Sequence, residues 1–135
     1  MADQIRKMTC LTATVEDRPG ILAEALKALA DANINMLGVW GYPISGGKGR
    51  IMGIPQDVEK ARALAAQTGV ELEESTVFVI EGEDRVGALV EPTRKIADAG
   101  INIYAATALA AGSRFTAAIW VNPDEVDRTA ELLGV

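Results

Sequence analysis

The sequence predicts an α+β protein that consists of two copies of one small module. Two turns of the same type, Asp17–Leu22 and Asp84–Leu89, lie 67 positions apart. Each turn is followed by an apolar helix pattern and then by an Ile-Asn pair, which ends at Asn35 in the first copy and at Asn102 in the second. A register shared across turn, helix and following strand indicates an internal duplication. We therefore expect one domain over residues 1–75 and another over residues 76–135.

The first module is expected to contain four strands and two helices in the order β-α-β-β-α-β. Its strands are rich in β-branched residues, and its helices repeat apolar residues at the spacing of one buried face. Residues 41–49 hold four glycines and a proline, which predicts a long, mobile hairpin connection. Residues 1–7 are polar and are interpreted as a short leader. The expected strands cover residues 8–15, 34–40, 50–54 and 70–75, and the expected helices cover residues 21–32 and 56–68.

The second module repeats this order but lacks an obvious last strand, because the chain ends where that strand should begin. Its sheet would keep an exposed edge, and exposed edges are generally covered. Either residues 70–81 serve both sheets, or a partner chain completes them. Pro92 falls inside the expected first helix, so that helix either starts later, near Val90, or is kinked. The other elements expected here are strands over residues 76–81, 101–109 and 114–121 and a last helix from Asn122 to Gly134.

This order of elements is the ferredoxin-like arrangement, an antiparallel sheet with helices on one face. Composition narrows the function. The formal net charge is −6, no basic run is present and aromatic residues make up 4%, which argues against nucleic-acid binding. The chain has no apolar run of membrane-spanning length.

Histidine is absent from the sequence, which removes the commonest general acid/base and the commonest transition-metal ligand. The single cysteine, Cys10, excludes an intrachain disulfide and fits a reducing compartment. We therefore expect a cytoplasmic protein without catalytic residues, without a metal site and without a cofactor.

The two turns are the candidate binding elements. A glycine-containing turn at the start of a helix presents unpaired backbone N–H groups and the positive end of the helix dipole, which together suit a carboxylate. The side chain of Asn35 can offer a carbonyl to an ammonium group. A free amino acid would satisfy both. The same residues are also common in turns and caps that bind nothing.

The pattern D-R-x-G-x-L, followed by a helix that ends in A-x-x-I-N and by a hairpin, resembles the ACT domain, twice over between Met8 and Val135. The resemblance implies ferredoxin-like modules that pair side by side and bind amino acids at the interface between paired modules. By position, it implies ligand-contacting residues in the first module at Asp17, Arg18, Pro19, Gly20, Ile21, Leu22 and Asn35. In the second module the matching positions are Asp84, Arg85, Val86, Gly87, Ala88, Leu89 and Asn102.

From these observations we expect an amino-acid-binding regulatory protein that works as a homodimer and catalyses no reaction. One alternative is a regulatory subunit of an amino-acid biosynthetic enzyme, which would make that enzyme a partner. A further alternative is a small enzyme that uses carboxylates such as Asp17 and Asp84.

Overall fold

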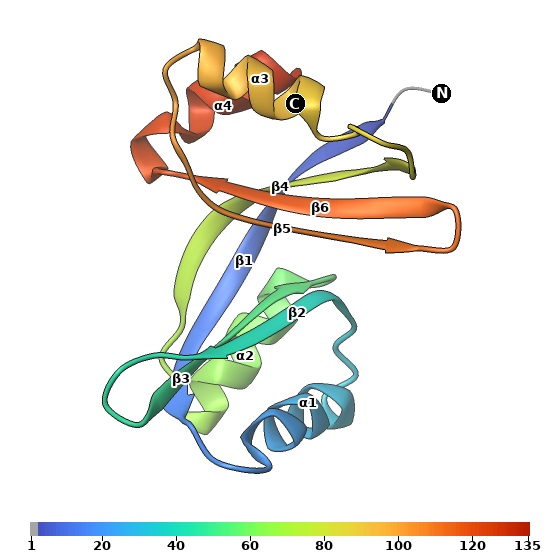
Figure 1. Ribbon diagram of the computed structural model, residues 1–135. Helices are drawn as coiled ribbons and strands as arrows, with labels where there is room; N and C mark the ends of the chain where they lie inside the picture. The colour runs from blue at the N-terminus through green and yellow to red at the C-terminus, as the bar shows by residue number, and fades with distance from the viewer. Residues whose placement is uncertain (1–2) are drawn as a thin grey trace. The chain divides into compact units, whose positions relative to one another are not determined.

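The computed structural model, which describes residues 3–135, confirms the α+β fold class with ferredoxin-like antiparallel strands (Figure 1). The helices and strands follow one another in nearly the predicted order. The strands are β1 (Gln4–Glu16), β2 (Met36–Pro43), β3 (Lys48–Pro55), β4 (Glu73–Glu83), β5 (Ile103–Ala111) and β6 (Arg114–Val121). The helices are α1 (Ile21–Asp31), α2 (Val58–Thr68), α3 (Val90–Asp98), the 3-10 turn η1 (Pro123–Glu125) and α4 (Val126–Leu133).

The chain divides into two compact units, and the boundaries between them fall within the strands β1 and β4. One unit, here called the 9–75 unit, is Thr9–Ser75. The other, here called the 76–135 unit, joins Thr76–Val135 to the segment that ends at Met8. Each of these two long strands therefore contributes one end to each unit.

The strand missing from the second module is supplied by the beginning of the chain. The hydrogen-bonded strand order is β2-β3-β1-β4-β6-β5, so the sheet of the 76–135 unit reads β1-β4-β6-β5. Arg6 of β1 forms an ion pair with Glu81 of β4 at 3.6 Å. The interpretation of residues 1–7 as a leader was wrong from Gln4 onward. The expectation that residues 70–81 serve both sheets is correct for Glu73–Glu81, which belongs to β4.

Two other local expectations are settled. Helix α3 begins at Val90, as one of the two alternatives predicted, and Pro92 therefore lies in its first turn. A proline is tolerated there because the N–H groups of a first turn have no hydrogen-bond partner within the helix. The long hairpin connection over residues 41–49 was wrong, because β2 continues to Pro43 and β3 begins at Lys48. The glycines Gly46 and Gly47, both with φ above +70°, make the short turn between these strands.

The paired residues of the two sheets can be matched position by position. In the 9–75 unit, β1 and β3 pair Leu11 with Gly53 and Val15 with Gly49. In the 76–135 unit, the positions 67 residues further along β4 are Phe78, which pairs with Ile119, and Gly82, which pairs with Phe115. The two sheets therefore offer corresponding positions with different side-chain volumes.

The two cores differ accordingly. In the 76–135 unit, α3 buries Pro92 and Ile96, and Ile96 joins a cluster that includes Phe78, Phe115 and Ile119. In the 9–75 unit, the buried cluster is Leu11, Ile34 and Ala61, and α1 buries none of its residues. No helix within the described part of the chain is long and apolar enough to cross a membrane.

Candidate functional site: two glycine turns

The first turn ends in Gly20, whose φ of 89° places it in the left-handed region that favours glycine. Helix α1 begins at the next residue, and no side chain caps it. The N–H of Ile21 donates to the carbonyl of Arg18 at 3.3 Å, which closes the turn. The helix start therefore presents backbone N–H groups that a ligand carboxylate can accept from.

The charged side chains of the first turn are partly committed to the protein itself. Arg18 donates to both carboxylate oxygens of Glu24, with Nη2 2.6 Å from Oε2 and Nη1 3.3 Å from Oε1. These hydrogen bonds lower the pKa of Glu24. The backbone N–H of Asp17 donates to the carbonyl of Gly47 at 3.0 Å, which ties the turn to the β2–β3 hairpin. Pro19 and Leu22 are exposed, and Ile21 is half-buried.

The second turn lines a pocket of about 420 Å³ that lies within the 76–135 unit. Gly87 has a φ of 78°, and the N–H of Val90 donates to its carbonyl at 3.0 Å. Helix α3 begins three residues after Gly87, whereas α1 begins directly after Gly20. The pocket's second wall is the stretch Ala108–Ala110 of the edge strand β5. Of the predicted residues, five line this pocket: Asp84, Arg85, Gly87, Ala88 and Leu89.

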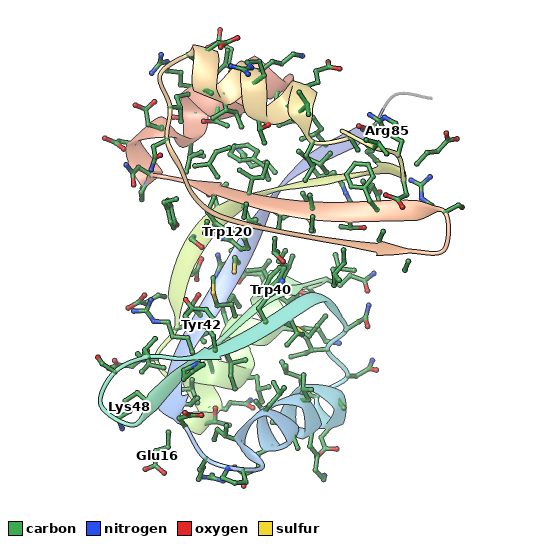
Figure 2. All side chains as sticks on the ribbon, in the orientation of Figure 1. Glu16, Trp40, Tyr42, Lys48, Arg85 and Trp120 are labelled. Carbon is green, nitrogen blue, oxygen red and sulfur yellow. The ribbon has the colours of Figure 1, made fainter. Side chains whose placement is uncertain are left out.

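Arg85 is held by a residue that no sequence pattern had connected to the turn. Its Nη1 and Nη2 donate to the two carboxylate oxygens of Asp3 at 3.1 and 3.0 Å, and Nη1 also donates to the carbonyl of Glu83 at 3.1 Å. Figure 2 labels the side chain of Arg85. The hydrogen bond from Arg85 lowers the pKa of Asp3 below its usual value. A Cβ at Gly82 would overlap the Asp3 carboxylate, so glycine at this position makes room for the pair.

Asn35 and Asn102 do not lie beside the turn of their own unit. The Nδ2 of Asn35 donates to Oε1 of Gln56 at 3.0 Å, at a shallow hollow beside the start of α2. The 11 residues of α1 separate Asn35 from Gly20, a rise of about 16 Å. Asn102 is exposed beyond the far end of α3 in the same way. A single small ligand therefore cannot contact the turn and the asparagine of one unit together.

Several apolar side chains around the second turn are exposed. Val86 is 105% exposed, Leu109 77% and Val90 62%. Exposed apolar side chains that gather around a pocket are typical of a surface that contacts another molecule. Sequence reasoning found Val86 but missed Leu109 and the rest of the β5 wall. The uncharged run Ala105–Ala111 on an edge strand was the available signal.

Comparison with known proteins finds one matching family. The family model of the ACT domain matches residues 11–67, which include the first turn and Asn35. A comparison with curated protein sequences finds no match.

Solved structures extend the fold along the whole chain. A Bacteroides thetaiotaomicron protein is similar with a TM-score of 0.84 and 22% identity, over 96% of this chain and 88% of that one. The regulatory subunit of aspartate kinase from Thermus thermophilus is similar with a TM-score of 0.62 and 15% identity, over 98% and 94%. Escherichia coli aspartokinase III in complex with lysine and aspartate gives 0.55 and 13%, over 99% of this chain and 32% of that one. Together these comparisons show similarity to the ACT domain over residues 11–67 and a ferredoxin-like fold along the chain.

Proposed function

We propose that this protein is a cytoplasmic regulatory protein that binds a free amino acid at contacts between ACT-like modules of two identical chains. The observation that carries the proposal is the second turn, where Gly87 opens a pocket against the edge strand β5. The first turn offers an uncapped helix start of the same kind. Both turns supply backbone N–H groups for a carboxylate, which every free amino acid carries.

Pairing of two chains would supply the other half of each site. In one unit, the turn and the asparagine lie at opposite ends of a helix, as described above. A twofold axis beside an edge strand places the start of a helix from one chain next to the end of the corresponding helix from the other. Such pairing would bring Asn35 or Asn102 of one chain toward the turn of its partner, where the amide could bind the ammonium group. The edge strands available for it are β2 and β5.

Thermal unfolding against a panel of the free amino acids tests the proposal. A ligand at about 100-fold excess over its dissociation constant stabilises the folded protein by roughly 2.7 kcal/mol, so the midpoint should rise by several degrees. Gly20→Val and Gly87→Val should abolish the shift. Gly69→Val is the matched control, because Gly69 has a similar φ of 73° but ends a helix instead of beginning one. A panel in which no amino acid shifts the midpoint would contradict the proposal.

A second candidate is a regulatory subunit that binds a larger biosynthetic enzyme. The exposed Val86, Val90 and Leu109 favour it, because such a surface also suits a protein partner. In that case a larger enzyme should co-purify with the wild-type protein and should be lost with Val86→Asp. If the wild-type protein purifies only with copies of itself, this candidate fails.

A further inference from the structure

A second cavity, of about 340 Å³ and partly open to solvent, lies in the 9–75 unit between helices α1 and α2 and the sheet. Its walls are almost entirely apolar. The polar side chains that reach it are Glu24 and Thr68, and no lysine or arginine lines it. Representative wall residues from all sides are Leu11, Ala25, Leu29, Leu64 and Ala65.

The cavity exists because the sheet of this unit carries smaller side chains than the equivalent sheet of the 76–135 unit. Leu11 and Gly53 stand where the other unit has Phe78 and Ile119. The end of the Met36 side chain occupies part of the space beside Gly53, because its Cε would overlap a Cβ there. At this pair the wall of the cavity is therefore formed by Leu11 and Met36.

A second pair of β1 and β3 residues also carries less side-chain volume than its equivalent in the 76–135 unit. Val15 and Gly49 stand where the other unit has Gly82 and Phe115, so a valine replaces a phenylalanine in volume. Between these two pairs, each unit has one alanine and one isoleucine, Ala13 with Ile51 and Ile80 with Ala117. This middle pair has the same side-chain volume in both units. In the 76–135 unit, a buried cluster that includes Phe78, Phe115 and Ile119 occupies the corresponding part of the core.

Helix α1 carries apolar side chains typical of a helix packed on a sheet, but none of them is fully buried. Leu29 is half-buried, whereas Ile96, 67 positions later in α3, is fully buried. Leu22 and Leu26 are 42% and 38% exposed. A dry cavity of about 150 Å³ lined by similar side chains is large enough for benzene, and this one has more than twice that volume.

We propose that the cavity beneath α1 binds a small uncharged apolar molecule, such as one that carries an aromatic ring or a short hydrocarbon chain. A ligand with a carboxylate would meet Glu24 and would find no cation in the wall, because Arg18 is bonded to Glu24 from outside the cavity. The cavity adjoins the first turn but is distinct from the backbone N–H groups proposed above to bind a carboxylate. Ile21 lines it directly after Gly20, so an occupant would also fix the start of α1.

The test is a titration of the full chain with toluene, followed by NMR of the side-chain methyl groups. We expect saturable shifts at the methyl groups of Leu11, Leu29 and Leu64. The methyl groups of Ile80 and Ile96, in the filled core of the other unit, should not move and serve as an internal control.

Cavity-filling variants sharpen this test. Ala65→Leu should weaken toluene binding by about tenfold or more and raise the unfolding midpoint. Ala63→Leu is the matched control, since Ala63 lies on the exposed side of α2 and should change neither quantity. Leu11→Phe, which introduces the residue found at the equivalent position of the other unit, gives a second filling variant if Ala65→Leu does not fold. The proposal is overturned if the wild-type titration shows no saturable shift, if both units shift alike, or if the folded filling variant binds as the wild type does.

Discussion

The carboxylate of Asp3 accepts hydrogen bonds from both terminal nitrogens of the Arg85 guanidinium, across 82 positions of the sequence. This contact joins the start of β1 to the turn that lines the 420 Å³ pocket. It also shows why the 76–135 unit is complete without a strand at its own C-terminal end. The beginning of β1 provides that strand, and Asp3 beside it fixes the orientation of a predicted site residue.

The Asp3–Arg85 contact makes a pH-dependent contribution to stability. Because the folded protein holds the pKa of Asp3 below its ordinary value, the contribution is fully present at neutral pH and is lost as the pH falls through the lowered pKa. We expect Asp3→Asn to lower the urea midpoint at pH 7 and to make a progressively smaller difference below about pH 4. Urea titrations of both proteins from pH 7 to pH 3 measure this. In an Arg85→Gln background the difference should disappear, and its persistence there would contradict the assignment.

The glycine beneath this ion pair gives a steric prediction. A methyl group at Gly82 would overlap the Asp3 carboxylate and would approach Cε1 of Phe115 to 3.3 Å. We expect Gly82→Ala to cost about 1–3 kcal/mol, the usual range for overpacking. Gly41→Ala is the matched strand control, because its Cβ would come no closer than 3.6 Å to a neighbour. Chemical denaturation gives both values, and an equal cost for the two variants would refute this reading of the contact.

The order of elements could be predicted because each element carries its own local signal. Pro92 alone limited the start of α3 to Val90 or a kink, and the structure begins the helix at Val90. The N-terminal strand was missed because its exposed residues, Gln4, Arg6 and Lys7, give it the polarity of a tail. Edge strands commonly carry such charges, so polarity could not distinguish the two.

The candidate site was predictable only in part. The turn residues gather because they are adjacent in sequence, whereas the β5 wall reaches the pocket through the register between β5 and β6. That register depends on tertiary packing and has no local signal. The separation of Asn35 from Gly20, in contrast, follows from the helical rise over the expected helix between them.

The difference between the two cores predicts different costs for equivalent truncations. Ile96→Ala removes a fully buried side chain from a filled core and should cost about 2–5 kcal/mol. Leu29→Ala, at the equivalent position of α1, should cost clearly less, because the leucine already borders a cavity and is half-buried. Hydrogen exchange resolved by residue reports the stability of each unit separately. Equal losses would mean that α1 packs on its sheet as tightly as α3 does.

The exposed edge of β5 predicts where two chains meet. Leu109 lies on this strand beside the second turn and is 77% exposed, so a lysine there would cost the single chain little. If the proposed homodimer pairs through this edge, Leu109→Lys should shift the protein from dimer to monomer in sedimentation equilibrium, because a desolvated charge opposes association. Leu132→Lys applies the same change to α4, at a leucine that is 37% exposed, and should leave the association unchanged. A Leu109→Lys protein that remains dimeric would direct the search for the interface to the other edge strand, β2.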